Sequence, residues 1–201
     1  TPGLGAGRDL VLLPGSRESV VRRNLPWMVR VLRRVRELIG EVPVVLSQER
    51  EEIARTCAEL LGRDAEWIRI EGGGLHAALA QARAAFSVSG TILVDVLHHR
   101  VPAVVIYRLA RGWQVAAVPH TLTVPYFSSI NLLAAEEVVP EFYFHGDGPL
   151  EDVAQSIARA YADDAWRAGC RRGLDRAAER LGPSGASRRA ALHLLSARRG
   201  A

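Results

Sequence analysis

The chain has 201 residues, 48% of them hydrophobic and 24% charged, which is the composition of an ordinary globular protein with a core of its own. All 26 basic residues are arginine, and the formal net charge of +4 favours an anionic ligand or an anionic membrane surface without choosing between them. The longest apolar runs have only the length of a strand, which predicts no bilayer-spanning helix.

The first two-thirds of the chain alternate between short apolar runs and helical stretches. Residues 1–8, which begin Thr-Pro-Gly, are predicted to be a linker, and strands are expected at 9–13, 42–47, 67–70, 84–88 and 103–107. The helices expected between these strands span 24–39, 49–61, 75–83 and 92–98. Continuous apolar strands separated by helices are typical of a parallel sheet with both faces covered. The predicted fold class is therefore α/β, with a doubly wound, Rossmann-like parallel sheet in residues 9–162.

The last part of the chain changes character. Residues 108–144 show no regular period, whereas 150–161, 165–181 and 187–197 have helical patterns. Residues 163–201 are therefore predicted to form a C-terminal helical extension. The helix expected at 24–39 has a basic face that could rest on an acidic membrane, although packing on the sheet with that face in solvent is the favoured interpretation.

Three turns rich in small residues follow predicted strands. They lie at 14–17, 72–74 and 89–91. Ligands of open α/β sheets bind outside the carboxyl ends of the strands, and all three turns fall at those ends. We therefore expect a binding site at this edge of the sheet.

The turn Pro14-Gly15-Ser16-Arg17 has the chemistry of an anion site. Gly15 and Ser16 leave backbone N–H groups free, the helix that follows adds its partial positive charge, and Arg17 supplies a fork of donors. A diphosphate is the expected guest, and an ordinary strand-to-helix turn is the alternative. The turn matches neither a P-loop nor a Gly-x-Gly-x-x-Gly fingerprint, which disfavours a nucleoside triphosphatase and a dehydrogenase.

The turn at 89–91 offers complementary groups. Ser89, Gly90 and Thr91 can meet a phosphate, and either hydroxyl can instead cap the next helix. Asp95 lies four residues after Thr91 on the same helical face, where its carboxylate can accept both hydroxyls of a ribose. A capped helix with a solvated aspartate is the alternative.

The remaining candidates give weaker signals. Gly72 and Gly73 permit a close backbone approach to a ligand, and a flexible connector is about equally expected. Cys57 and Cys170 lack a metal-site spacing and are predicted to be reduced thiols of a cytoplasmic protein. The six histidines form no ligand set and no Gly-x-Ser-x-Gly elbow is present, so we expect no metal and no hydrolase chemistry by that route. We also expect no nucleic-acid partner.

Together these motifs resemble the lipid-A-disaccharide synthase family. The resemblance rests on Pro-Gly-Ser-Arg after the first strand and on Ser-Gly-Thr with an acidic residue four positions later. It also rests on Val-Pro-Ala-Val-Val-Ile-Tyr-Arg at 101–108, Ser-Ile-Asn-Leu-Leu at 129–133 and Val-Pro-Glu at 139–141. The order and the spacing of these motifs fit the family across roughly residues 9–160.

The resemblance implies a fold, a reaction and a location. The fold is the GT-B architecture, in which two Rossmann-like domains face each other across a cleft, with this chain as the C-terminal, UDP-sugar-binding half. The reaction transfers 2,3-diacylglucosamine from UDP to 2,3-diacylglucosamine 1-phosphate in lipid A biosynthesis, with the UDP-sugar as donor substrate and without a metal or other cofactor. The location is cytoplasmic, at the surface of the inner membrane. An N-terminal acceptor domain would complete the enzyme, and this chain alone would bind the donor without turning it over.

The matched motifs also imply roles for individual residues. By position, the diphosphate would meet Ser16, Arg17, Ser89, Gly90 and Thr91. Asp95 would hold the ribose in place of the family's glutamate. Tyr107 and Arg108 would border the cleft beside the donor, and Asn131 and Glu141 would orient the sugar or close the site. No residue of this chain is assigned a catalytic role.

The chain departs from the family pattern at Val20, Arg83, Asp95 and Phe144, where the family usually has Glu, Asp, Glu and Gln. Nucleotide binding is compatible with these changes, whereas the identity of the sugar and of its acyl chains stays open. Two alternatives therefore remain beside the transferase. One is another GT-B enzyme of UDP-sugars, similar to a UDP-N-acetylglucosamine 2-epimerase, and the other is a non-catalytic nucleotide-binding module.

Overall fold

The computed structural model describes residues 7–113, 124–182 and 185–199. This part of the chain contains a six-stranded sheet in the order β3-β2-β1-β4-β5-β6, and all neighbouring strands are parallel. The strands are β1 (Asp9–Leu13), β2 (Val44–Ser47), β3 (Ile68–Glu71), β4 (Ala82–Val88), β5 (Ala103–Leu109) and β6 (Glu141–His145). This is the order of a doubly wound sheet, and it confirms the predicted fold class.

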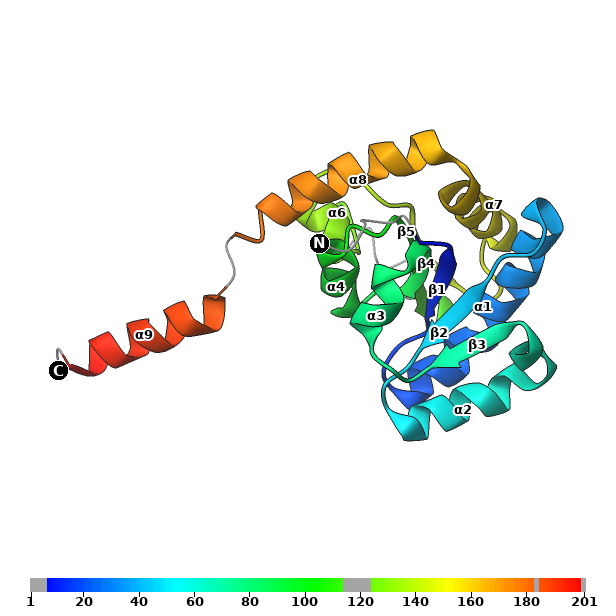
Figure 1. Cartoon of the computed structure of the whole chain (residues 1–201), viewed down its shortest axis with the longest axis horizontal. Coiled ribbons are helices and arrows are strands. Elements are labelled where there is room, and N and C mark those ends of the chain that lie inside the picture. Colours follow the sequence, from blue (N-terminus) through cyan, green and yellow to red (C-terminus); the bar gives the residue numbers. More distant parts are fainter. Residues whose placement is uncertain (1–6, 114–123, 183–184, 200–201) are drawn as a thin grey trace.

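Helices cover both faces of the sheet (Figure 1). One face carries α1 (Glu18–Ile39), α2 (Glu51–Leu61) and α7 (Leu150–Ala162). The other face carries α3 (Leu75–Ala80), α4 (Ile92–His98), α6 (Ser129–Ala134) and α8 (Asp164–Glu179). A 3₁₀ helix, η1 (Gly62–Glu66), leads from α2 to β3, and α9 (Ala186–Arg199) projects from the body of the molecule.

The two faces follow from the alternation of side chains along each strand. In β1, Leu10 and Leu12 join the core under α1, α2 and α7, whereas Val11 and Leu13 join the core under α3, α4, α6 and α8. Because both faces are buried, the central strands read as continuous apolar runs rather than as an alternation of apolar and polar residues. Because all six strands are parallel, their carboxyl ends lie at one edge of the sheet.

The first helix is longer than predicted. α1 begins at Glu18 rather than at residue 24, and Pro26 lies inside it. Proline lacks the N–H that would bond the carbonyl four residues earlier, so the sequence pattern places a helix start close to it. Pro26 is exposed, which leaves room for its ring, and the nearby carbonyl of Arg23 accepts a hydrogen bond of 2.5 Å from Nη1 of Arg108.

Other boundaries moved as well. The helix predicted at 75–83 ends at Ala80, and β4 begins at Ala82 rather than at residue 84. The irregular stretch 108–144 contains α6 and β6, which the sequence did not reveal. β6 lies at the sheet edge beside β5, and only Phe144 of its five residues is buried, so its hydrophobic pattern is weak.

The C-terminal helices differ from each other. α8 supplies Cys170, Leu174 and Ala177 to the core on its side of the sheet, whereas Leu192 and Leu195 of α9 are exposed. Of the predicted linker, residues 1–6 lie outside the described residues. Within the described ranges, every helix is too short or too polar to cross a membrane.

Candidate ligand-binding groove

A groove runs along the carboxyl edge of the sheet and is built from three adjoining cavities. The β2–β1 cavity has a volume of about 200 Å³, the β1–β4 cavity about 430 Å³ and the β4–β5 cavity about 190 Å³. The first two share the walls Gly15, Ser16, Leu75 and Ile92, and the last two share Arg17, Val20, Val88 and Ser89. The groove is therefore continuous across four strands.

The β1–β4 cavity unites two of the predicted turns. Its walls include Gly15, Ser16 and Arg17 from the first turn and Ser89, Gly90, Thr91 and Asp95 from the second turn and α4. They meet because β1 and β4 are neighbours in the sheet. This juxtaposition was expected from the sequence, and the ligand that these residues bind stays a prediction.

The turn between β1 and α1 has a tightly fixed backbone. Gly15 has a φ of +116°, and a Cβ at this position would lie 2.7 Å from Cγ1 of Val20. The amide Nε2 of the buried Gln48 donates to the carbonyl of Gly15 at 3.0 Å, and Nη1 of Arg50 donates to the carbonyl of Ser16 at 3.4 Å. Two carbonyls of the turn are thus held from the loop between β2 and α2, which fixes the turn at the wall of the groove. Gln48 was not predicted, and its only signal is a polar residue directly after the buried strand.

Arg17 lies at the start of α1, and its guanidinium has no ion-pair partner among the described residues. It is the N-cap residue, and its side chain, which has no acceptor, makes no capping hydrogen bond. The exposed guanidinium makes no hydrogen bond or ion pair with another described residue. Helix N-terminus and guanidinium together make this corner of the groove attractive for an anion.

On the opposite wall, the hydroxyls of the second turn do not cap α4, contrary to one predicted use. Thr91 is the N-cap residue, but its side chain makes no capping bond. Oγ of Ser89 donates instead to the carbonyl of Phe127 at 3.3 Å. Asp95 is half-buried one helical turn after Thr91 and lines the same cavity. The Thr91 hydroxyl and the Asp95 carboxylate are therefore both placed to meet a ligand.

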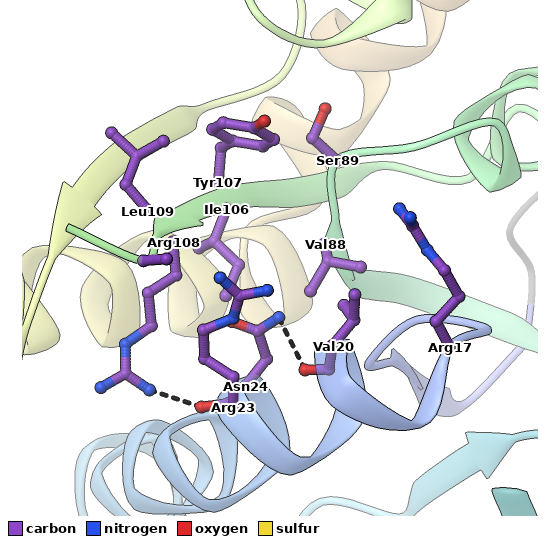
Figure 2. A pocket seen from close by; sticks show the side chains of 11 residues that line it. Arg17, Val20, Arg23, Asn24, Val88, Ser89, Ile106, Tyr107, Arg108 and Leu109 are labelled. Carbon is purple, nitrogen blue, oxygen red and sulfur yellow. Dashed lines mark hydrogen bonds between the residues drawn. The ribbon is translucent and has the colours of Figure 1, made fainter. Parts of the chain in front are cut away.

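Tyr107 and Arg108 line the β4–β5 cavity, as Figure 2 shows. Arg108 is held by two carbonyls, since Nε donates to Gly146 at 2.9 Å and Nη1 donates to Arg23. Burial lowers the pKa of the Arg108 guanidinium, the charge of Asp147 acts in the opposite direction, and the nearby Arg23 lowers the pKa further. The exposed ring of Tyr107 stacks on Phe127, with centroids 6.2 Å apart. Both residues share this cavity with Arg17 and Ser89, and their role beside a donor stays a prediction.

The side chains of Asn131 and Glu141 form hydrogen bonds within the protein. Oδ1 of Asn131 accepts from the N–H groups of Val138 and Val139, and its amide donates to the Glu141 carboxylate at 3.0 Å. Glu141 also accepts at 2.8 Å from each of the N–H groups of Phe127 and Ser128. The pair fastens the segment before α6, so any effect on a ligand runs through the placement of that segment.

The third predicted turn lies outside the shared cavities. β3 is separated from β1 by β2, and neither Gly72 nor Gly73 is among the described walls of the three cavities. The N–H of Gly73 donates to the Glu71 side chain at 3.1 Å. Leu75, at the start of α3, is the residue that brings this turn to the groove.

A histidine pair joins α3 to α4 close to Asp95. Nδ1 of His76 and Nε2 of His99 lie 2.9 Å apart. Burial lowers the pKa of His99, and the neighbouring His76 and His98 lower it further, while Asp95 acts in the opposite direction. In the part of the chain that the structure describes, no three acidic, histidine or cysteine side chains are grouped as a metal site.

Comparisons with known proteins identify relatives of this chain. A family profile described as Lipid-A-disaccharide synthetase matches residues 6–161. A lipid-A-disaccharide synthase of Myxococcus xanthus is 34% identical over 210 residues, covering 96% of this chain and 50% of the relative. One of Geobacter sulfurreducens is 28% identical over 191 residues (94% and 49%), and one of Pseudomonas putida is 34% identical over 164 residues (80% and 42%). The chain thus spans about half the length of the curated relatives it matches.

Proposed function

Because this chain belongs to the lipid-A-disaccharide synthetase family, we propose that its groove binds the UDP-sugar donor of a glycosyltransferase. The proposed reaction moves 2,3-diacylglucosamine from UDP to 2,3-diacylglucosamine 1-phosphate. The observation that carries the proposal is the β1–β4 cavity, where Arg17, Thr91 and Asp95 form a cationic wall, a hydroxyl and a carboxylate around one space. A nucleoside diphosphate has a diphosphate that suits the cation and the hydroxyl, and ribose hydroxyls that suit the carboxylate.

The diphosphate lies between the two turns in this proposal. The uncapped start of α1 and the free guanidinium of Arg17 face it from one side. Gly90 and the Thr91 hydroxyl face it from the other side, where the absence of a side chain at Gly90 allows a close approach. Two opposed donor walls hold a doubly charged group more firmly than one wall does.

The nucleoside extends toward the β2–β1 cavity. Asp95 accepts hydrogen bonds from the ribose hydroxyls, since a carboxylate can accept two donors at once. Beyond it, Leu13, Leu75 and Ile92 give the β2–β1 cavity apolar walls that suit the face of a base. The donor then lies along the rim of the sheet with its base nearest β2.

Transfer of the sugar needs more than this chain. Arg17 and the start of α1 stabilise the negative charge that builds on the departing UDP. The acceptor and the group that activates it belong, in this proposal, to an N-terminal domain of the kind that occupies the other half of the relatives. The complete enzyme works in the cytoplasm, peripherally at the inner membrane, where a lipid-linked acceptor is found.

The four departures from the family pattern fall into two groups. Arg83 donates to the carbonyl of Tyr161 at 2.7 Å, and Phe144 is buried with its ring 4.7 Å from that of Trp27, so both belong to the packing of α1, α7 and α8. Val20 and Asp95 line the groove itself. Of these four positions, Val20 and Asp95 are therefore the ones expected to affect donor binding.

Calorimetric titration with UDP and uridine tests the donor proposal. Arg17→Ala should weaken UDP binding about 10- to 100-fold, because a hydrogen bond to a charged group contributes ~1.5–3 kcal/mol, and should leave uridine binding unchanged. Asp95→Ala should weaken both ligands, since both carry the ribose. Arg33→Ala is the matched control, because Arg33 is also on α1 but pairs with Asp64 at 2.7 Å and lines none of the three cavities.

The outcomes separate the alternatives. Equal losses for UDP and uridine in Arg17→Ala would refute the diphosphate role of this residue. UDP binding no tighter than about 1 mM would refute the donor proposal itself. Turnover of a UDP-sugar to a 2-epimer by this chain would favour the epimerase-like alternative instead.

A further inference from the structure

The β4–β5 cavity contains a buried acceptor that has no partner. Asn24, on α1, is only 4% exposed and lines the cavity. Its Nδ2 donates to the carbonyl of Val20 at 3.0 Å, whereas its Oδ1 accepts no hydrogen bond from any described residue. Exchanging the two amide atoms would set Oδ1 against the Val20 carbonyl, two acceptors together, so the orientation drawn in Figure 2 is the favourable one.

The described residues around Asn24 do not supply the missing donor. The described walls of the cavity include the cations Arg17, Arg23 and Arg108 and no carboxylate. Arg108 donates to the carbonyls of Gly146 and Arg23, and Asn24 lines the same cavity (Figure 2). Buried acceptors are almost always satisfied, and an orphaned one in a cavity is a place where a ligand or a water supplies the donor.

The position of the cavity identifies which part of the ligand would reach it. The β4–β5 cavity shares Arg17 and Ser89 with the cavity proposed for the diphosphate, and it lies on the side away from Asp95. A donor with its ribose at Asp95 and its diphosphate at Arg17 therefore directs its sugar into the β4–β5 cavity. Sugars carry hydroxyl groups, and amino sugars carry amide N–H groups, and either can donate to Oδ1.

We propose that Asn24 is a specificity-determining residue that reads the transferred sugar, with Oδ1 accepting a hydrogen bond from a hydroxyl or an amide N–H of that sugar in the β4–β5 cavity. This inference rests on the proposed function, since it needs the diphosphate at Arg17. It assigns the sugar to residues of α1, β4 and β5 in this chain. The exposed ring of Tyr107 forms the outer wall beside the same sugar.

Titration of the full 201-residue chain with UDP, UDP-glucose and UDP-N-acetylglucosamine tests this role. Asn24→Leu is close in size and removes both the unpartnered Oδ1 and the bond from Nδ2 to Val20, so the variant should fold with a thermal midpoint near that of the wild type. We expect it to bind UDP as the wild type does and to bind one or both UDP-sugars about 3- to 10-fold more weakly, the loss of one neutral hydrogen bond. A loss for both sugars indicates a shared hydroxyl, and a loss for UDP-N-acetylglucosamine alone indicates its amide N–H.

Thr56→Val is the matched control. Thr56 is also buried on a helix and also bonds the carbonyl four residues earlier, that of Glu52 at 3.3 Å, but it lies on α2 and lines none of the three cavities. It should change none of the three affinities. If wild-type UDP binding is normal and Asn24→Leu leaves the ratio of UDP-sugar to UDP affinity unchanged, a water satisfies Oδ1 and the inference is overturned alone. If wild-type UDP binding is absent, the proposed function fails and takes this inference with it.

Discussion

Replacing Gly15 with alanine should destabilise the turn that presents Ser16 and Arg17 to the groove. A non-glycine residue at a φ of +116° is strained by about 1–3 kcal/mol. The added Cβ would also lie 2.7 Å from Cγ1 of Val20, and forcing an extra carbon into packed space costs a further ~1–3 kcal/mol. We expect a loss of about 2–5 kcal/mol in the free energy of unfolding, measured by urea denaturation, together with weaker UDP binding.

Two further variants separate the backbone strain from the contact. Gly40→Ala is the matched control, because Gly40 has a φ of +82° but no atom lies within 4 Å of its added Cβ, so the variant reports strain alone. Val20→Ala should cost less in the Gly15→Ala background than in the wild type, by at least about 1 kcal/mol, because it removes the crowded methyl group. A loss for Gly15→Ala no larger than that for Gly40→Ala, with no coupling to Val20, would show that the turn is not packed as described.

Three other predictions follow from particular contacts. Glu141→Gln should lower the thermal midpoint and speed amide hydrogen exchange at Phe127 and Ser128, because an NH₂ group would replace one of the two carboxylate oxygens that accept from these residues. Unchanged exchange would show that the carboxylate does not hold this segment in place. Because the pKa of His99 is lowered in the folded chain, the unfolded chain takes up this proton first as the pH falls. The free energy of unfolding should therefore decrease below about pH 6.5, and His99→Gln should flatten that decrease. An equally steep profile in the variant would exclude His99 as its source. Burial raises the pKa of Cys57 to about 11 and that of Cys170 to about 12. Alkylation of these thiols near neutral pH should therefore be far slower in the native chain than after denaturation. Equal rates would contradict the burial of the two thiols.

Local sequence pattern was sufficient for the parts of the fold that depend on local order. β1 and α4 lie where they were predicted, because a short apolar run bounded by turn residues and a short periodic segment determine them directly. The start of α1 was misplaced, since a proline inside a helix is tolerated only when its surroundings leave room for it. β6 was missed because an edge strand shows little hydrophobic alternation, and its pairing with β5 depends on residues far away in the sequence.

Only some of the residues of the groove could likewise be predicted from the sequence. The turns at 14–17 and 89–91 were found because glycine, serine and arginine after a buried strand are informative by themselves, and strand order then brought them together. Gln48 and Asn24 were not found, because a polar side chain within an apolar segment shows its role only when its distant or orphaned partner is known. Asn131 and Glu141 were singled out, but only the folded chain shows that they bond each other.

A crystal structure of this chain with UDP is the most direct test of the proposed diphosphate site between the two turns. We expect the diphosphate between Ser16–Arg17 and Gly90–Thr91, with the ribose hydroxyls on the carboxylate of Asp95. UDP bound away from these two turns, or bound with its diphosphate facing solvent and Arg17 uninvolved, would contradict the proposed role of the groove.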